Sequence, residues 1–315
     1  MRGRALRLGT RRSPMAMTQA GQVAQMITGR TGLVVDLVGV TTFGDVSRAE
    51  LAQIGGTGVF VNALRERLLA GEVDLAVHSL KDLPTAQPDT VALAGVPARD
   101  DPRDALAARD GAKLADLPPG ARVGTGSPRR AGQLRALRPD LDCVPIRGNA
   151  DTRLARVVSG DLHAVVLAYA GLARIGRQDA VTQVFEIDEM LPAPGQGALA
   201  VECRADDAEL VEQLAAVDDR PSRVAVTAER SVLAALEAGC SAPVGAYAAG
   251  KDVLHLRAVV LATDGSGAVR LSRSGPVENT AAAERIGRDL AAELLARGAR
   301  AHIAVPQARS NSGSM

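Results

Sequence analysis

The sequence predicts an α/β protein with two α/β domains followed by a small α+β domain. Short apolar runs alternate with helical patterns in two successive cycles, and near residue 220 this alternation gives way to long helices and paired alternating segments. The chain has 315 residues, of which 46% are hydrophobic. That is enough for two or three domains, each with a core of its own.

The first cycle has the order strand, helix, strand, helix, strand, which is typical of a mostly parallel sheet. The second cycle begins near residue 121 and repeats this order. In the first cycle we expect strands at 5–10, 33–40 and 73–80, with helices at 14–29 and 60–71. In the second we expect strands at 121–126, 142–146 and 164–171, with helices at 128–138 and 150–160.

The third part of the chain has a different pattern. Helices are expected at 222–239 and 279–298, with alternating, strand-like segments at 253–262 and 268–275. Residues 98–105 and 218–222 are polar and contain proline, so they are candidate hinges. The predicted domains are 1–97 together with 198–217, then 98–197, then 218–309, with a disordered tail at 310–315.

Composition narrows the class of function. The net charge of +1 gives no bias toward nucleic acid or membranes. Three cysteines without a C-x-x-C spacing argue against a disulfide framework, and they argue against a zinc site, so no metal is expected. The first residues contain no apolar signal region, and no run of about 18 uncharged apolar residues occurs. We therefore expect a cytoplasmic protein without a membrane or nucleic-acid partner.

Two matching turns suggest anion sites. "GTRRSP" (9–14) and "GTGSP" (124–128) each end a strand and place serine and proline where a helix begins. Ser13 and Ser127 suit the N-cap, and the prolines suit the first helical position. Arginines flank both turns: Arg11, Arg12, Arg129 and Arg130. Ordinary capping with solvated arginines would explain one such turn, but two in successive domains favour an anionic ligand shared between them.

Further arginines follow other predicted strands, namely Arg147, Arg153 and Arg174. Together with the arginines of the two turns they could line one cleft. A guanidinium group matches a carboxylate in a bidentate manner, so a ligand with several carboxylates would suit such a cleft. A phosphate polymer suits it less well, because no aromatic residues interleave for base stacking.

Two other stretches contain candidate reactive groups. In "AVHSLKDLPT" (76–85), Lys81 and Asp82 end a buried strand, either as a surface ion pair or as a working carboxylate with its partner. In "LEAGCSAPVGAYA" (236–248), Cys240 lies in a loop of small residues, where a thiol is accessible and could be reactive or modified. Cys203, in contrast, lies on an apolar face.

The motifs together resemble the porphobilinogen deaminase (hydroxymethylbilane synthase) family over roughly residues 5 to 305. "HSLKDLPT", "GTGSPRR", "IRGN…TRL", "PAPGQGALAVE" and "LEAGCSAPVGAYA" match its signatures in order. The resemblance implies two domains folded like periplasmic binding proteins plus a small third domain. It implies a transferase of tetrapyrrole (haem) biosynthesis that joins four porphobilinogen units head to tail and releases ammonia at each step. It also implies a dipyrromethane cofactor held by a thioether to Cys240.

The resemblance also assigns roles to residues. Asp82 is the implied catalytic carboxylate, which would stabilise the cation that forms when ammonia leaves. The implied cofactor-binding residues, besides Cys240, are Lys81, Ser13, Ser127, Arg129 and Arg130. The implied substrate-binding residues are Arg11, Arg147, Arg153 and Arg174.

One segment departs from the family pattern. Residues 41–58 match its mobile active-site loop, but Gln53 and Thr57 stand where lysines are common. Arg48 could compensate for the lost charge. Gly126 also replaces the usual serine of "GTGSPRR", a change that keeps the turn.

Two other functions fit part of the pattern. A two-lobed binding module for a small polycarboxylate ligand would also have anion sites at helix N-termini, although the third domain and Cys240 argue against it. A hydrolase with a cysteine nucleophile would need a histidine partner, and none of the four histidines is recognisably paired with Cys240. His78 is expected to be an ordinary strand residue. For the oligomeric state we expect a monomer.

Overall fold

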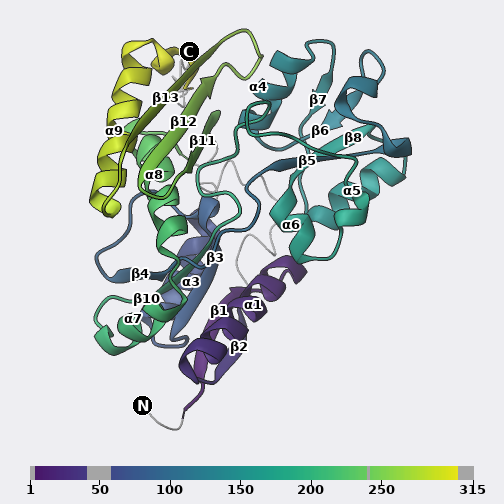
Figure 1. Cartoon of the computed structure of the whole chain (residues 1–315). Coiled ribbons are helices and arrows are strands. Elements are labelled where there is room, and N and C mark those ends of the chain that lie inside the picture. The colour runs from purple at the N-terminus through teal and green to yellow at the C-terminus, as the bar shows by residue number, and fades with distance from the viewer. Residues whose placement is uncertain (1–3, 41–57, 240–241, 304–315) are drawn as a thin grey trace, which may run out of the picture.

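The computed structural model of the chain describes residues 4–40, 58–239 and 242–303. Cys240, the tail 310–315 and nearly all of the predicted loop 41–58 lie outside these ranges. Figure 1 shows the described strands gathered into three sheets, with helices packed against them. Within the described ranges, no helix is long and apolar enough to cross a membrane.

The first sheet has the strand order β2-β1-β3-β10-β4. Strands β1, β2 and β3 are parallel, as predicted, while β10 returns from much later in the chain and runs antiparallel between β3 and β4. The strands are β1 (Leu6–Arg11), β2 (Val35–Val40), β3 (Leu75–Ser79), β4 (Val91–Gly95) and β10 (Leu199–Arg204). The helices are α1 (Pro14–Thr31), α3 (Gly58–Leu69) and α7 (Ala208–Leu214).

The second sheet repeats this order as β7-β6-β8-β5-β9, with β5 antiparallel to both of its neighbours. In both sheets, therefore, three parallel strands lie next to one antiparallel strand, β10 in the first and β5 in the second. The strands are β5 (Asp104–Ala108), β6 (Arg122–Gly124), β7 (Asp142–Val144), β8 (Ala164–Ala168) and β9 (Gln183–Val184). The helices are α4 (Pro128–Leu137), α5 (Ala150–Val158) and α6 (Tyr169–Arg174).

The third sheet is antiparallel, in the order β11-β12-β13, with α8 and α9 packed against it (Figure 1). Its strands are β11 (Val244–Ala249), β12 (Val253–Leu261) and β13 (Ala268–Pro276). Its helices are α8 (Arg220–Ala235) and α9 (Thr280–Ala296). The fold class is thus confirmed as two similar α/β lobes and a small α+β unit. The three sheets fall within the predicted domain ranges, whose boundaries remain a prediction.

Several predicted boundaries were wrong. The strand expected at 164–171 ends at Ala168, where α6 begins; this helix also buries apolar residues, including Ala170 and Leu172, so the apolar run did not reveal the change. The candidate hinge 98–105 ends earlier, because Asp104 already belongs to β5. The helix expected at 222–239 begins at Arg220 and already ends at Ala235.

Two segments cross between the lobes, 96–103 outward and 185–198 on the return. They touch where Asp100 donates its N–H to the carbonyl of Gly197, at 3.2 Å. A Cβ at Gly197 would lie 2.6 Å from the carbonyl oxygen of Asp100, and its φ of +88° also favours glycine. The glycine-rich motif "PAPGQGAL" therefore allows the two crossings to pack closely.

Glu229 of α8 joins the crossings to the third sheet. Its carboxylate, which is fully buried, forms a bidentate ion pair with Arg99, with N–O distances of 2.6 and 3.0 Å. It also accepts the backbone N–H groups of Gly195 and Ala248, at 2.7 and 2.9 Å. One buried carboxylate thus connects the outward crossing, the return crossing and β11.

Candidate active site

Lys81 and Asp82 lie in a short 3-10 turn, Leu80–Asp82, directly after the buried strand β3. The Lys81 side chain is half-buried and its amine donates to Gln196 Oε1 at 3.3 Å. Asp82 is exposed, and its carboxylate forms no hydrogen bond or ion pair with any residue in the described part of the chain. The two are therefore not a surface ion pair: Lys81 turns inward, while the carboxylate of Asp82 is exposed.

The two predicted N-caps are confirmed. Ser13 accepts the N–H of Ala16, and Ser127 accepts the N–H of Arg130, both at 3.4 Å. Each is followed by proline at the start of its helix. The caps lie at the carboxyl ends of β1 and β6, which occupy equivalent positions in the two sheets.

Arg129 and Arg130 share one buried counter-ion, Asp104. Each guanidinium lies 2.7 Å from a different oxygen of this fully buried carboxylate. The two arginines hold the pKa of Asp104 well below its usual range, despite burial. Asp104 was not predicted as a site residue, because it lies inside 98–105, the segment predicted to be a hinge.

Lys81 is the third cation of this group, which we call the cation cluster (Lys81, Arg129 and Arg130). Burial, followed by the charge of Arg130, lowers the pKa of Lys81 to about 8, and the negative charges of Asp82 and Asp104 only partly offset this. Arg129 and Arg130 thus pair with one buried carboxylate, Asp104, and Lys81 is joined to the same group through Gln196. This excess of positive charge over buried negative charge favours an anionic ligand.

A small pocket adjoins the cation cluster. Among its lining residues are Lys81, Ser127 and Arg129, together with Gly239 and Ala242, which flank the undescribed residues 240–241. The Nε atom of Arg129 is buried without a hydrogen-bond partner among the described residues. Predicted cofactor-binding residues from two lobes therefore meet in this pocket. An orphaned donor and excess positive charge fit a group that carries carboxylates, as dipyrromethane does.

Three of the predicted substrate-binding arginines line the carboxyl ends of strands or the helices that follow them. Arg11 ends β1 and is half-buried. Arg153 in α5 donates to the carbonyl of Gly148 at 2.8 Å, and burial together with the charge of Arg130 lowers its pKa, which places it near the cation cluster. Arg147 is exposed and its side chain has no hydrogen bond or ion pair to any described residue.

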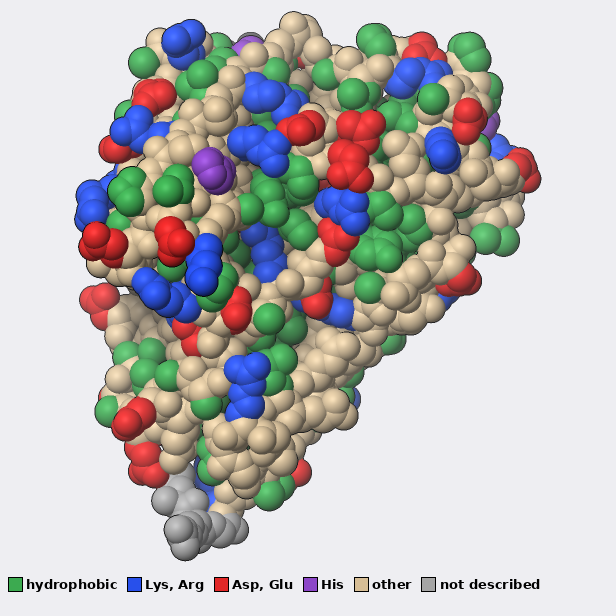
Figure 2. All heavy atoms as spheres, viewed as in Figure 1, with side chains coloured by type: hydrophobic (Ala, Val, Ile, Leu, Met, Phe, Trp, Pro, Cys, Tyr) green, Lys and Arg blue, Asp and Glu red, His purple; other side chains and the backbone are tan. Residues whose placement is uncertain are grey.

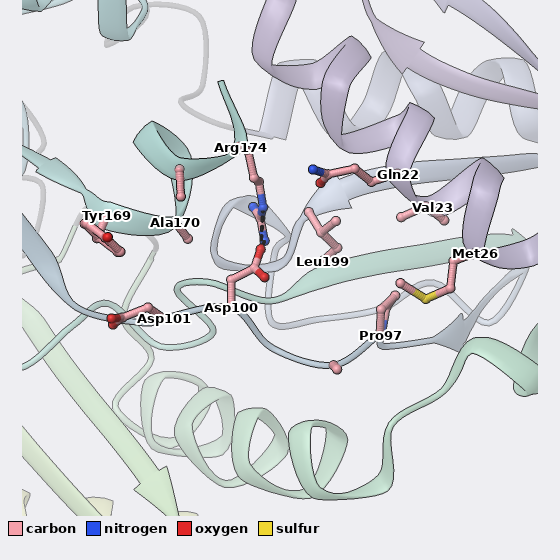
Figure 3. Close-up of a pocket in the computed structure, with 12 residues that line it drawn as sticks. Gln22, Val23, Met26, Pro97, Asp100, Asp101, Tyr169, Ala170, Arg174 and Leu199 are labelled. Atoms are coloured by element: carbon pink, nitrogen blue, oxygen red, sulfur yellow. Dashed lines mark hydrogen bonds and ion pairs between the residues drawn. The ribbon is translucent and has the colours of Figure 1, made fainter. Parts of the chain in front are cut away.

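Arg174, the fourth of these arginines, lies elsewhere. Its guanidinium pairs with Asp100 at 2.7 Å and donates to the carbonyl of Gly197 at 2.6 Å. Figure 3 shows this pair in a cleft of about 460 Å³ that is lined by α1, α6, the outward crossing and Leu199. In this structure Arg174 holds the two crossings together.

The described cysteines are poor nucleophiles. Cys143 and Cys203 are both buried and unpaired. Burial raises the pKa of both thiols, that of Cys203 to about 11. Because the thiolate is the reactive form, a covalent attachment at either residue is disfavoured.

A second buried ion cluster lies beneath the turn that carries Lys81 and Asp82. Arg65 of α3 pairs with Glu202 of β10 at 2.6 Å, and His78 Nε2 of β3 lies 3.3 Å from the same carboxylate. His78 is thus a buried strand residue, as expected, but with an ionic neighbour that the sequence did not reveal. The cluster ties α3 to the strand that carries the turn.

Figure 2 shows acidic and basic side chains interspersed over one face of the molecule, which agrees with the net charge of +1. The excess of positive charge in the cation cluster is therefore a local feature, and it is largely buried. No group of three or more His, Cys, Asp or Glu residues in the described part of the chain is placed to hold a metal ion.

The chain is thus a protein of two α/β lobes with equal strand order and a pocket lined by cations from both lobes. Comparisons with known sequences identify its family. Residues 6–212 match the family model described as "Porphobilinogen deaminase, dipyromethane cofactor binding domain", and residues 224–296 match "Porphobilinogen deaminase, C-terminal domain". The chain belongs to the porphobilinogen deaminase family.

Relatives match along nearly the whole chain. A porphobilinogen deaminase of Thermobifida fusca is 63% identical over 300 residues, which is 93% of this chain and 94% of the relative. Porphobilinogen deaminase 1 of Streptomyces coelicolor is 61% identical, over 95% of this chain and 97% of the relative. Among solved structures, a periplasmic substrate-binding protein of an ABC transporter from Coxiella burnetii has a TM-score of 0.43 and 17% identity, over 67% of this chain and 91% of that one.

Arg147 provides a test of substrate contacts. Because its side chain is exposed and has no hydrogen bond or ion pair to any described residue, Arg147→Ala should leave the melting temperature unchanged. A charged hydrogen bond contributes about 1.5–3 kcal/mol, so we expect KM for porphobilinogen to rise roughly tenfold to a hundredfold. Arg174→Ala is the contrasting variant, and it should lower the melting temperature because it releases Asp100 and Gly197. An unchanged KM in Arg147→Ala would remove this residue from the substrate site.

Proposed function

We propose that the chain is a hydroxymethylbilane synthase, a transferase of tetrapyrrole (haem) biosynthesis. It joins four porphobilinogen molecules head to tail into the linear tetrapyrrole hydroxymethylbilane and releases one ammonia for each unit. Membership of the porphobilinogen deaminase family supports this assignment. The structural observation that carries it is the cation cluster: Arg129 and Arg130 pair with the buried Asp104, and Lys81 and Arg129 line a pocket together with Gly239 and Ala242.

The cofactor in this proposal is dipyrromethane, attached through a thioether to Cys240. When bound, it supplies the pyrrole carbon to which the first substrate unit is joined. Arg129 and Lys81 would bind its carboxylates, with Arg130 behind them, and the caps Ser13 and Ser127 would present the N-termini of α1 and α4. Because the thiols of Cys143 and Cys203 are buried with raised pKa values, Cys240 is the remaining candidate for the attachment.

The arginines further from the cluster would receive the substrate. Each porphobilinogen unit carries an acetate and a propionate, so the growing chain gains two negative charges at each step. Arg11, Arg153 and the exposed Arg147 would bind these carboxylates, since guanidinium groups match them in a bidentate manner. Arg174 would act from the crossing that it holds to Gly197.

Asp82 would stabilise the positive charge that develops on porphobilinogen. When ammonia leaves, the remaining methylene carries a positive charge that is shared with the ring nitrogen. A carboxylate fixed at the end of a rigid strand can face this charge without reorganisation, which is how preorganised groups lower a barrier. The carboxylate of Asp82 has no internal partner among the described residues, so it is available for this role.

The remaining proposals concern setting and partners. We place the protein in the cytoplasm as a monomer, with porphobilinogen as its small-molecule substrate and without a nucleic-acid or membrane partner. We also propose the domain ranges given above, in which 198–217 complete the first domain and the third begins at 218.

A two-lobed binding module is the second candidate, favoured by the equal strand order of the two lobes. Incubation of the purified protein with porphobilinogen separates the two functions. The synthase should release ammonia in equal amount to the porphobilinogen consumed, and Cys240→Ser should release none. A binding module would bind porphobilinogen without consuming it, and that result would overturn the proposed function.

A further inference from the structure

A single buried amide, that of Gln196, connects the cation cluster to its counter-ion. Gln196 is fully buried on the return crossing. Its Nε2 donates to Asp104 Oδ1 at 2.9 Å and to the carbonyl of Pro102 at 2.7 Å. Its Oε1 accepts from Lys81 Nζ at 3.3 Å and from Arg130 at 3.5 Å. Lys81 belongs to the first lobe, in the turn after β3, while Asp104 in β5 and Arg130 in α4 belong to the second, so this side chain links both lobes.

These contacts leave the amide only one orientation. Its nitrogen faces a carboxylate and a carbonyl, which can only accept, while its oxygen faces an ammonium and a guanidinium, which can only donate. A glutamate at this position would set a second carboxylate against Asp104, and an apolar side chain would satisfy neither group. Glutamine is therefore suited to this position by both ends of its side chain.

The backbone around Gln196 is held as firmly as its side chain. Arg99 Nε donates to the carbonyl of Gln196 at 2.8 Å, and the N–H of Gln196 donates to Ala193 at 2.9 Å. Gly195 and Gly197 on either side have φ angles of +76° and +88°. The amide thus projects from a rigid segment, as a group that fixes others should.

We propose that Gln196 is a positioning residue of the cofactor pocket, which holds the Lys81 ammonium of one lobe against Arg130 and Asp104 of the other. The Lys81 ammonium and the Arg130 guanidinium both lie within hydrogen-bond distance of the same amide oxygen, and like charges this close repel one another. The amide oxygen between them offsets that repulsion. The cations are then in place before any carboxylate of the ligand arrives. The identity of the ligand in this inference rests on the proposed function. The hydrogen bonds by which Gln196 joins Lys81 to Asp104 and Arg130, which we call the Gln196 bridge, do not.

The test uses the small number of lysines in the chain. Lys81, Lys113 and Lys251 are the only three, and the last two are exposed, so they serve as internal standards. Trace acetylation with acetic anhydride at a series of pH values, read by peptide mass spectrometry, gives the reactivity midpoint of each amine. The measurement is made in the Cys240→Ser background, so that no cofactor influences Lys81.

The variants are Gln196→Leu and Gln196→Asn, the second of which keeps an amide too short to reach both partners. Gln133→Leu is the matched control. Gln133 is equally buried, and its amide bonds only to the backbone, at Leu191 and Arg129. If Gln196 had a merely structural role, Gln196→Leu and Gln133→Leu would therefore have the same effect on the reactivity midpoint of Lys81.

The midpoint of Lys81 should lie near pH 8 in the parent. Loss of an acceptor that stabilises the ammonium should lower it by about one unit in both Gln196 variants, while Gln133→Leu leaves it in place. A midpoint that stays within about 0.3 units in both Gln196 variants, or one that moves as far in Gln133→Leu, would overturn the proposal.

A second readout uses the chain that retains Cys240. The dipyrromethane adduct, measured by intact mass, should be present on a smaller fraction of the Gln196 variants than of Gln133→Leu. Equal fractions would contradict a role in placing the cofactor. Absence of the adduct from every protein, the parent included, would count against the proposed function instead, and the lysine midpoints would then decide the bridge alone.

Discussion

Asp82→Asn is expected to fold and to bind porphobilinogen, but to turn over about a hundredfold more slowly or worse. Asparagine keeps the shape of the side chain and removes its negative charge. The proposed interaction exists mainly after ammonia has begun to leave, so its loss should affect kcat more than KM. Single-turnover kinetics with intact-mass detection would follow the enzyme as it gains one to four units.

Two further variants sharpen this prediction. Asp82→Glu keeps the charge but displaces it by one methylene, so it should retain more activity than Asp82→Asn. Asp89→Asn removes an exposed carboxylate from the segment that follows the same turn, and it should react at the parent rate. If Asp82→Asn passes through all four additions at nearly the parent rate, the carboxylate does not stabilise the developing cation.

Glu229→Ala is expected to lower the free energy of unfolding by about 3–5 kcal/mol, the usual consequence of removing one partner of a buried ion pair. The change leaves the buried Arg99 guanidinium without its counter-charge. It also leaves the N–H groups of Gly195 and Ala248 without their acceptor. Urea unfolding monitored by circular dichroism would measure the loss.

Glu284→Ala is the control for this second prediction. Glu284 pairs with Arg288 on the exposed surface of α9, where an ion pair contributes little. Its removal should change the free energy of unfolding by less than about 0.5 kcal/mol. A similar, small loss in Glu229→Ala would show that Glu229 does not join the crossings to the third sheet.

Much of each lobe could be predicted from local signals in the sequence. The Ser13-Pro14 and Ser127-Pro128 pairs mark helix starts because the serine oxygen caps a backbone N–H and proline needs no hydrogen bond there. The alternation of apolar runs and helical periodicity located β1, β2 and β3, and it located β6, β7 and β8 in the same way. These features depend on neighbours in the sequence, and so they are readable from it.

The features that were missed depend on distant contacts. Asp104 and Arg130 are 26 residues apart, and Gln196 and Lys81 are 115 apart, so nothing local marks these pairs. Lys81, Arg129 and Arg130, which the sequence named as candidate cofactor-binding residues, do lie together, and their role remains a prediction; the buried carboxylate and amide between them were not predicted.

The proposed function requires that this chain carries dipyrromethane on Cys240 and builds a tetrapyrrole on it. The intact mass of the purified protein, before and after addition of porphobilinogen, tests this most directly. We predict a mass above that of the sequence by two linked pyrrole units, a ladder of one to four further units on addition of porphobilinogen, and the bare sequence mass for Cys240→Ser. A parent protein at the bare sequence mass that gains no units from porphobilinogen, or an adduct that persists in Cys240→Ser, would contradict the account.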